Sequence, residues 1–291
     1  MVDGSIIVTT YNHAPYIGLC FRSIIEQTTS RRLRIVWHDD ASTDETVKLG
    51  ERELQNCPHE VVRIHRTVNR VSRRIPLFLD MFEQCQGEFL FMLDGDDCWA
   101  SNNKVDLQID ALNANPDINL CFTRAVIAEG AELKPVGVAS QYGDTRTVMS
   151  FDQVVRGDGD FMPTASLCFR RKVFDSAPLW LSGYIPVGDY PMQVIGSYPA
   201  GALYLPDVTS IYRTNIEGAW TTTVYNNLEK RFDLELEMLE LFHAINRSFP
   251  GHKEAIMAVA TKHFVQLLSL SVTHNRFSTL EKALLILKDI Q

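Results

Sequence analysis

The sequence lacks long apolar runs and an excess of basic residues. No stretch of about 18 apolar residues occurs in the 291-residue chain, so the sequence predicts no membrane-spanning helix. The chain has 28 lysines and arginines against 36 aspartates and glutamates, a formal net charge of −8. This excess of acid disfavours a broad nucleic-acid-binding surface. The amino-terminal "MVDGSIIVTTYN" also lacks the basic, apolar and small-residue segments of a signal peptide.

Paired cysteines are missing as well. The 6 cysteines are scattered singly, without a C-x-x-C pair, and most of them lie in apolar runs. This usage predicts buried free thiols in a reducing cytoplasm, rather than a disulfide framework or a zinc site. The cysteines are Cys20, Cys57, Cys85, Cys98, Cys121 and Cys168.

The first half of the sequence alternates regularly between strand and helix patterns. Strands are predicted by the apolar runs 5–8, 33–37, 60–65, 88–93 and 118–128. Helical patterns follow the first, second, third and fourth of these runs, and the second helix has the capping-box residues Ser42 and Glu45 at its start. Strands that alternate with helices predict crossover connections. We therefore expect an α/β fold with a mixed, mainly parallel sheet flanked by helices.

The second half is less regular until it becomes helical. Residues 129–160 are polar and glycine-rich, which predicts loops. The next expected elements are a strand, a helix and a pair of short strands, over 164–174, 188–198 and 201–213. From about Asn226 the apolar residues recur at helical spacing. We therefore expect an α/β domain over 1–225 and a helical segment over 226–291.

Carboxylates gather where predicted strands end. Asp39 and Asp40 follow the second strand, and Asp94, Asp96 and Asp97 follow the fourth in "GEFLFMLDGDDCW". The carboxyl ends of parallel strands form the ligand-binding edge of an open sheet. Like charges this close repel one another, and burying one without a partner costs several kcal/mol. The cluster therefore predicts a cation, and Mg²⁺ or Mn²⁺ shared with substrate phosphates matches the hard oxygen ligands best.

An Asp-Gly hairpin turn is the alternative interpretation of "DGDD". Residues 100–103, Ala-Ser-Asn-Asn, do not continue as an alternating partner strand, so the hairpin fits poorly. Composition and spacing alone thus indicate a nucleotide-phosphate or metal site on an α/β sheet.

Taken together, the motifs resemble those of a known family. The segments "SIIVTTYNHAPYIGLCFRSIIEQT", "RIVWHDDASTDET" and "GEFLFMLDGDDCWASNNKVDLQ" are similar to successive motifs of family 2 glycosyltransferases with the GT-A fold. The segments "PTASLCFRR", "VGDYPMQVIGS" and "TSIYRTNIEGAW" resemble the later half of a bacterial subgroup. The resemblance implies a GT-A catalytic domain over 1–225 and inverting transfer of a sugar from a nucleoside diphosphate, preferably UDP, to an acceptor hydroxyl. It also implies a divalent cofactor, Mn²⁺ or Mg²⁺.

The resemblance further implies roles in donor binding. Asp94 and Asp96 match the D-x-D motif, with Asp96 in direct contact with the metal and Asp94 nearer the ribose. Asp40 matches the residue that accepts a hydrogen bond from the pyrimidine N–H. The donor-site residues implied in this way are Thr9, Tyr11, Asn12, Asp40, Arg73, Asp94 and Gly95, and the metal ligands are Asp96 and Asp94.

Several of these residues have simpler alternative roles. Tyr11 and Asn12 also suit a plain turn, and Asp39 and Asp40 also suit a helix N-cap. The arginines of "NRVSRR", Arg73 among them, either supply positive charge near the diphosphate or form a solvated basic loop.

The acceptor side rests on fewer matches. Asp189 in "VGDYP" matches the catalytic base of the family, and the alternative is an acid placed favourably at a helix N-terminus. Trp99 matches an aromatic residue at the acceptor mouth, with a packed tryptophan as the alternative. Trp220 lies in "NIEGAW", where related sequences carry a histidine and paired glycines and this chain has Asn215 and "EGAW". Histidines without ligand spacing, expected to be ordinary surface or loop residues, are His13, His38 and His65.

Two rival functions are considered beside the glycosyltransferase. A sugar-phosphate nucleotidyltransferase uses a similar sheet, but its phosphate loop is glycine-rich and "TTYNHAPY" contains no glycine. A catalytically silent carbohydrate-binding homologue is disfavoured by the joint presence of Asp40, Asp94, Asp96 and Asp189.

The expected partners are a nucleotide-sugar donor and a glycan, lipid-linked or protein acceptor, in bacterial surface-glycan synthesis or protein glycosylation, with no nucleic acid. The helical segment packs on the catalytic domain, self-associates, or associates peripherally with the inner face of the membrane. Its acids disfavour an anionic bilayer surface. We expect a cytoplasmic protein. The sequence ends at "LLILKDIQ" without a helix-stop signal, which leaves open whether it is a fragment of a longer protein.

Overall fold

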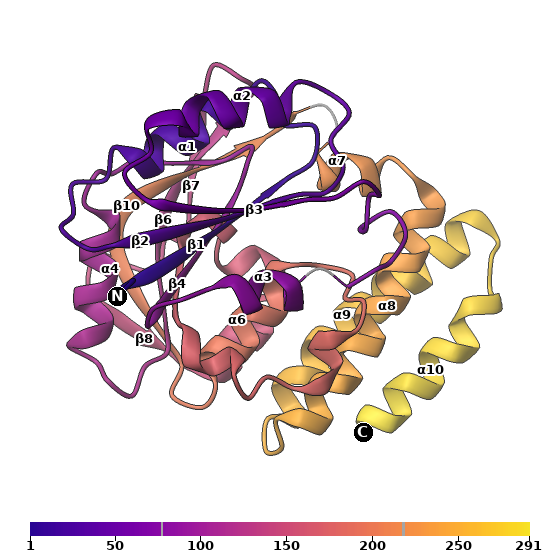
Figure 1. Cartoon of the computed structure of the whole chain (residues 1–291). Coiled ribbons are helices and arrows are strands. Elements are labelled where there is room, and N and C mark those ends of the chain that lie inside the picture. Colours follow the sequence, from indigo (N-terminus) through magenta and orange to yellow (C-terminus); the bar gives the residue numbers. More distant parts are fainter. Residues whose placement is uncertain (77, 217–218) are drawn as a thin grey trace.

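The computed structural model describes residues 1–76, 78–216 and 219–291, and its core is one mixed sheet covered by helices (Figure 1). The strand order along the sheet is β3-β2-β1-β4-β9-β6-β10-β5. The first part of this order consists of parallel neighbours, namely β3 (Glu60–His65), β2 (Leu33–Asp39), β1 (Gly4–Thr10) and β4 (Phe89–Asp94). These strands are the apolar runs of the first half of the sequence.

The rest of the sheet mixes directions. β9 (Leu167–Arg170) is antiparallel to both β4 and β6 (Leu120–Glu129), and β10 (Ala202–Thr214) is parallel to β6. Strands β1, β2, β3, β4, β6 and β10 therefore run in the same direction. The short strands β5 (Cys98–Trp99), β7 (Lys134–Ala139) and β8 (Thr147–Met149) pair antiparallel at the margins. The expected mixed, mainly parallel α/β sheet is confirmed.

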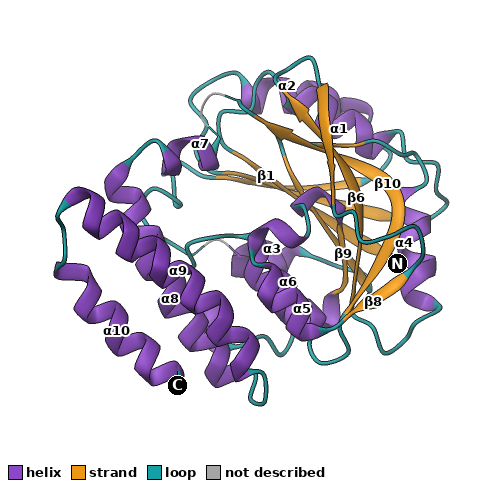
Figure 2. Cartoon of the chain, turned by 180° about the vertical axis from the view of Figure 1, so that it is seen from behind, coloured by secondary structure: helices purple, strands orange, loops and turns teal. Residues whose placement is uncertain are grey.

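Helices lie on both faces of the sheet (Figure 2), and an apolar core fills the space between the sheet and the helices on each face. On one face, residues of α1 (Ile17–Ile25) and α4 (Lys104–Asn113) pack on β1, β2 and β4, and the partly buried side chains of α2 (Thr46–Glu53) pack at its margin. On the other face lie α3 (Phe78–Gln84), α5 (Phe151–Gly157) and α6 (Asp189–Ser197).

The chain ends in helices, as expected. They are α7 (Trp220–Tyr225), α8 (Leu228–Ser248), α9 (Lys253–His274) and α10 (Ser278–Ile290). Buried residues of α8 and α9, such as Phe242 and Ile256, belong to the same apolar cluster as Phe151 of α5 and Tyr190 of α6. Figure 1 shows α8, α9 and α10, in orange and yellow, side by side at one end of the molecule. The helical segment is thus packed on the α/β part through a shared core.

Helix α9 is long and apolar enough to cross a membrane by length and composition, which the sequence did not predict. In the fold 44% of its apolar window is buried, and a packed core helix passes the same test. Among its buried residues are Val259, His263 and Leu267. Of the residues that the structure describes, no other helix meets this criterion.

Three expectations about local structure are wrong. Residues 129–160 contain β7, β8 and α5 besides loops. The sequence did not indicate the two strands because they are largely exposed and lack an apolar pattern. Residues 201–213 form the single strand β10 rather than two, since register shifts around Val208 absorb the interruption in its pairing. Ser42 does not cap α2, because its hydroxyl donates to Asp39 at 2.6 Å instead.

Candidate active site

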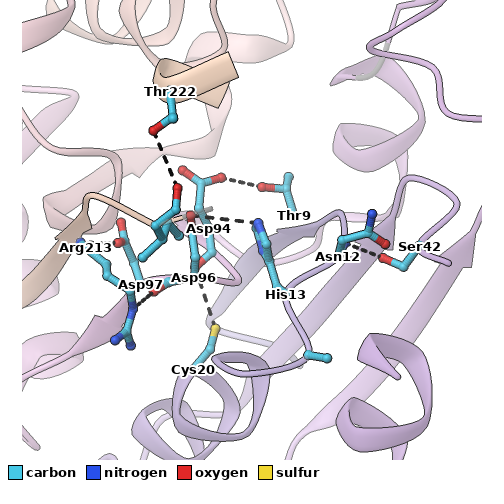
Figure 3. Close-up of polar contacts among 12 residues, drawn as sticks. Thr9, Asn12, His13, Cys20, Ser42, Asp94, Asp96, Asp97, Arg213 and Thr222 are labelled. Atoms are coloured by element: carbon cyan, nitrogen blue, oxygen red, sulfur yellow. Dashed lines mark hydrogen bonds and ion pairs between the residues drawn. The ribbon is translucent and has the colours of Figure 1, made fainter. Parts of the chain in front are cut away.

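The carboxyl ends of β1, β2 and β4 bring the predicted residues to one edge of the sheet. The strand register places Thr9 opposite Asp94 and Thr10 opposite Asp39. The Thr9 hydroxyl donates a hydrogen bond to Asp94 Oδ1 (Figure 3). The Thr10 hydroxyl donates to Asp39 Oδ2 at 2.8 Å. Each of these strands therefore ends on a threonine or an acid that faces the neighbouring strand.

Residues 94–97 form a tight turn after β4. The Asp97 N–H donates to the Asp94 carbonyl at 2.9 Å, and the Gly95 N–H donates to the Thr9 carbonyl at 2.8 Å. A Cβ atom at Gly95 would lie 2.5 Å from Thr10 Cγ2 and 2.9 Å from His13 Nδ1, so only glycine fits there. The chain then continues into β5, which pairs with β10 and not with β4. The Asp-Gly hairpin is therefore wrong, as the sequence indicated.

Arg213 of β10 holds this turn through hydrogen bonds. Its N–H donates to Asp97 Oδ1 at 2.7 Å and its Nε donates to the Asp96 carbonyl at 2.6 Å (Figure 3). The guanidinium also lies over the Tyr16 ring, 4.6 Å from the centroid. Both Asp97 and Arg213 are buried. Asp97 thus has a structural partner, which leaves Asp94 and Asp96 as the acids open to a ligand.

The electrostatics of the turn favour a bound cation. Burial raises the pKa of Asp94, and the charge of Asp96 raises it further. Burial also raises the pKa of Asp97 well above its usual range, with Asp96 and Asp94 adding to the effect. His13 Nε2, 3.8 Å from Asp96 Oδ2, is the nearest basic side chain to Asp96 that forms an ion pair. The guanidinium of Arg213 thus faces three carboxyl groups at this turn, so negative charge remains in excess there.

This donor set fits a divalent cation that is shared with a substrate. Within residues 1–76, 78–216 and 219–291, no group of three histidine, cysteine, aspartate or glutamate side chains is arranged as a complete metal cage. Mg²⁺ and ions like it commonly use one or two carboxylates and complete their coordination with water and phosphate oxygens. Asp94 and Asp96 provide two carboxylates of this kind at the sheet edge.

The loop after β1 is fixed by polar contacts to the loop after β2. Asn12 has a left-handed backbone with φ of 56°, its N–H donates to Ser42 Oγ at 2.9 Å, and its Oδ1 accepts from the Thr43 N–H at 2.8 Å. Tyr11 stands beside it with 42% of its surface exposed. Asn12 therefore supports the turn, and Tyr11 is the side chain free to contact a ligand.

Asp39 and Asp40 serve loops rather than a helix N-terminus, so the N-cap alternative is wrong for both. Asp39 accepts from the Ser42 N–H at 2.8 Å and is buried. Asp40 Oδ1 accepts from the Arg70 N–H at 2.8 Å, and its Oδ2 accepts from the Val71 N–H at 3.0 Å. Asp40 thus holds the loop after β3 against the sheet edge, although each of its oxygens keeps a second lone pair.

Two of the three arginines in that loop have acidic partners. Arg70 Nη1 lies 2.8 Å from Asp80 Oδ2 of α3. Arg74 Nη2 lies 3.0 Å from Asp233 and 2.7 Å from Glu237, both on α8. Arg73 is exposed, and its side chain makes no hydrogen bond or ion pair with any residue that the structure describes. Arg73 is therefore the arginine best placed to pair with the negative charge of a bound ligand.

Asp189 begins helix α6 and lies within electrostatic range of the turn. Its carboxylate accepts from the N–H of the adjacent Tyr190 at 2.8 Å. Burial raises the pKa of Asp189 to about 7, and the negative charge of Asp94 adds to the rise. Tyr212 of β10 lies in the same field, because burial and the charges of Asp97 and Asp189 raise the pKa of its phenol. A carboxyl group poised in this way can take up a proton near neutral pH.

The family to which the chain belongs now follows from comparison. The model of the family described as "Glycosyl transferase family 2" matches residues 5–175. The chain belongs to glycosyl transferase family 2. The resemblance on which the sequence interpretation rested is confirmed, and the nucleotidyltransferase alternative gives way to it.

Solved structures share the fold of this glycosyltransferase. TarS of S. aureus superposes with a TM-score of 0.62 at 15% identity, over 96% of this chain and 44% of TarS, so the chain spans less than half of that protein. TarS 1–349 in complex with UDP-GlcNAc gives 0.59 at 16% identity, over 97% and 89% of the two chains. The mannosyltransferase PcManGT from Pyrobaculum calidifontis, in complex with GDP-Man and Mn²⁺, gives 0.53 at 15% identity, over 100% and 86%. The GT-A fold is confirmed.

The sequence relatives have less specific names than the solved structures. An uncharacterized protein of Mycobacterium tuberculosis is 26% identical over 261 residues, covering 86% of this chain and 70% of the relative. An uncharacterized glycosyltransferase of Nostoc is 25% identical over 174 residues, covering 59% of this chain and 52% of the relative.

The tryptophans of the glycosyltransferase have different environments. Trp99 is 5% exposed, packs edge-on against Phe91 with ring centroids 5.6 Å apart, and lies 5.5 Å from Lys104 Nζ. This placement favours the packed tryptophan over a residue at the acceptor mouth. Trp220 begins α7 and is 40% exposed, so it is free to meet an acceptor. Asn215 Nδ2 donates to Glu129 at 2.6 Å. The rest of the expected loop, Glu217 and Gly218, lies outside the described residues.

The sequence interpretation missed Arg213 and His13. Arg213 lies 116 positions from Asp97 in the chain, and nothing in the local pattern of β10 indicates that contact. His13 was expected to be an ordinary loop residue, but the turn after β1 places it next to Gly95 and Asp96. Its position directly after "TTYN" in a ligand-edge loop was the available signal.

Proposed function

We propose that this glycosyltransferase moves a sugar from a nucleoside diphosphate sugar, with UDP as the expected nucleotide, to an acceptor hydroxyl with inversion and with the aid of Mn²⁺ or Mg²⁺. The observation that carries the proposal is the pair of carboxyl groups Asp94 and Asp96 at the end of β4, with a third, Asp189 at the start of α6, within the electrostatic range of Asp94. A donor diphosphate alone would be repelled there, whereas a metal–diphosphate pair compensates the acids.

Donor binding uses the loops at the ends of β1, β2 and β3. Asp96 and Asp94 are the proposed metal ligands, and the Thr9 hydroxyl orients the Asp94 carboxylate. Asp40 fixes the loop that carries Arg73, and Arg73 is the proposed contact for the diphosphate. The exposed ring of Tyr11 is the proposed surface for the nucleotide base. When bound, the divalent ion would neutralise charge on the departing diphosphate.

Asp189 is the proposed general base. A carboxylate acting as a base must reach the acceptor hydroxyl directly or through one water while the sugar carbon is attacked. Its pKa of about 7 keeps a fraction of the group ionised at neutral pH and lets it hold the proton that it takes up. Attack by an acceptor activated in this way, from the side opposite the diphosphate, inverts the sugar carbon.

The structural neighbours support the donor class. TarS is described in complexes with UDP and with UDP-GlcNAc, and the mannosyltransferase in a complex with GDP-Man and Mn²⁺. Each has a fold like that of this chain. We take the acceptor to be a glycan, a lipid-linked glycan or a protein, and the setting to be the cytoplasmic side of bacterial surface-glycan synthesis or protein glycosylation.

Thermal unfolding in the presence of UDP tests the proposal. We expect UDP with Mn²⁺ or Mg²⁺ to raise the melting temperature of the full chain clearly more than UDP with EDTA, because binding to the folded state stabilises it by mass action. Asp96→Ala should keep the fold and lose the metal-dependent part of the rise. Asp144→Ala is the matched control, since that acid is 93% exposed and pairs with Arg124. Equal rises with and without metal in the unmutated chain would contradict a shared metal.

A further inference from the structure

A buried cluster of charged groups joins the C-terminal helices to the catalytic part. His263 of α9 lies between two carboxylates, with its Nε2 2.9 Å from Asp158 Oδ2 and its Nδ1 2.7 Å from Glu235 Oε2 of α8. The residues Asp158, Glu235 and His263 are 8%, 5% and 7% exposed. Lys262 Nζ also donates to Asp158 Oδ2 at 3.0 Å. We call these three buried side chains the histidine cluster.

The cluster is an imidazolium held by two anions. Both ring nitrogens face carboxylate oxygens, which accept and do not donate when ionised, so each nitrogen has to carry a proton. Burial alone would lower the pKa of His263, but the bonds to Asp158 and Glu235 raise it to about 9. The same contacts hold the pKa of Asp158 near 2. The Gln266 amide nitrogen, in the orientation that gives it an acceptor, donates to Glu235 Oε1 at 2.8 Å.

Asp158 starts a loop, residues 158–166, that runs back to the acid turn. Asp158 itself has a left-handed backbone with φ of 57°, a conformation that needs support in a residue other than glycine. Farther along, Met162 O accepts from Gln193 Nε2 of α6 at 3.0 Å. At the far end, the short 3-10 helix Thr164–Ser166 packs against β4, the strand that ends on Asp94. One short loop thus links the histidine cluster to Asp94.

The helix that bears Asp189 rests on the same cluster. The side chain of Tyr190, the residue after Asp189, is fully buried, and its hydroxyl donates to the Val155 carbonyl at 3.1 Å. Its ring lies 5.9 Å from that of Phe242 on α8, and the Phe242 ring lies 5.1 Å from the His263 ring. Gln193, one turn after Asp189 on α6, holds the 158–166 loop. The cluster is therefore connected through packing to α6, which bears Asp189, and through the 158–166 loop to β4, which ends on Asp94.

We propose that His263 is a positioning residue for sugar transfer: by binding Asp158 and Glu235 together, it fixes the 158–166 loop and the first turn of α6, and so sets the placement of Asp94 and Asp189. It touches neither donor nor acceptor. The activity part of this inference rests on the proposed function, whereas the structural part does not.

Hydrogen exchange on the full chain tests the structural part. In His263→Gln, we expect the amides of 158–166 and of the first turn of α6 to exchange at least tenfold faster, while those of β1 and β2 keep their rates. His252→Gln is the matched control, because His252 Nδ1 lies 2.6 Å from Asp152 and also joins α9 to α5, but outside the 158–166 loop. That variant should leave both segments unchanged.

Donor hydrolysis tests the activity part. With the UDP-sugar that stabilises the chain most, we expect His263→Gln to lower kcat at least tenfold and to raise KM as well, because the proposed base Asp189 and the proposed metal ligand Asp94 both lose their placement, whereas His252→Gln should keep both constants. If the unmutated chain neither binds nor hydrolyses any UDP-sugar, the proposed function fails while the exchange result still decides the structural claim. Should His263→Gln not fold, Lys262→Gln replaces it in the test. This variant removes the half-exposed second partner of Asp158 and should lower kcat in the same way, but by less.

Two results would overturn the inference. One is faster exchange confined to α8 and α9, with 158–166 and α6 unchanged. The other is unchanged kcat in a folded His263→Gln whose loop has been loosened.

Discussion

At the scale of single residues, the acids of the site divide by environment. Asp97 is occupied by Arg213, and Asp39 by Thr10 and Ser42, so these two side chains hold loops together. Asp94 and Asp96 have fewer fixed partners and repel one another. A buried carboxylate whose oxygens are filled with N–H and O–H donors is a structural element, whereas one left short of donors attracts a cation. This difference in hydrogen-bond donors distinguishes the proposed metal ligands, Asp94 and Asp96, from the acids that hold loops together.

The sequence could identify where the acids lie, but not how they divide. That Asp94 and Asp96 reach a ligand edge follows from the parallel order of the strands, which the apolar runs indicate. The partner of Asp97 comes from a strand more than 100 residues later, and such a contact depends on β10 pairing with β5. Burial of Trp99 likewise depends on that pairing, which is why its matching position in the family motif did not predict its environment.

Asp189→Asn is expected to fold and to bind UDP with metal as the unmutated chain does, but to lose acceptor-dependent transfer by about 10²–10⁴-fold, because an amide cannot take up the proton. A pKa of about 7 means that the base is ionised above and protonated below neutrality. The transfer rate of the unmutated chain should therefore rise as the pH rises through about 7, and this limb should be absent from the residual rate of the variant.

The control is Asp160→Asn, an exposed acid on the 158–166 loop that should keep its transfer rate. If Asp189→Asn retained near-normal transfer with its acceptor and Asp160→Asn did not, the base would have to be reassigned to Asp160.

At the scale of elements, the C-terminal helices are joined to the rest of the chain by ion pairs as well as by apolar packing. The acids of α8 that the sequence marked as unfavourable for a membrane surface are largely paired within the chain: Glu229 with Arg276, Asp233 and Glu237 with Arg74, and Glu240 with Lys282. These pairs are exposed or half-exposed, and each is worth little by itself. They connect α8 to the basic loop after β3 and to α10. The buried histidine cluster connects α8 and α9 to the catalytic part more strongly.

The histidine cluster predicts a loss of stability at alkaline pH. The folded-state pKa of His263 is raised from 6.5 to about 9, so its contribution to stability is full below pH 6.5 and disappears as the pH rises through 9. The shift corresponds to a contribution on the order of 3 kcal/mol. Urea unfolding at pH 7 and pH 9.5 should show a fall in stability in the unmutated chain that is much smaller in His263→Gln.

The comparison between variants is needed because Lys104 acts with the opposite sign. Burial lowers its pKa to about 7, so its unfavourable effect on folding decreases as the pH rises from 7. That effect is common to both chains and cancels in the difference. A fall of the same size in the unmutated chain and in His263→Gln would show that His263 is not the group responsible, and His252→Gln should behave as the unmutated chain.

At the scale of the whole molecule, the sequence pattern predicts two units, but the core does not stop at residue 225. The change from alternating strands and helices to helices alone is visible in the sequence because each has its own apolar period. Which surfaces those helices cover is not, since burial between distant segments leaves no periodic signal. In the fold, Phe242 and Ile256 share one apolar cluster with Phe151 and Tyr190.

A chain ending at residue 225 is therefore expected not to fold cooperatively. Removal of α8 and α9 would expose the buried faces of α5 and α6, with Phe151, Val154 and Tyr190 among the residues that lose cover. Each fully buried side chain of this size is worth about 1.5–3 kcal/mol, and several of them exceed the stability of about 5–15 kcal/mol typical of a domain. The matched control is a chain ending at Asn275, since the buried residues of α10 are Ala283 and Ile290 alone. Thermal unfolding followed by circular dichroism should show a cooperative transition for the chain ending at Asn275, at a lowered melting temperature, and none for the chain ending at residue 225. A cooperative transition near the full-length melting temperature in the shorter chain would instead establish residues 1–225 as an independent domain with the helices as an appendage.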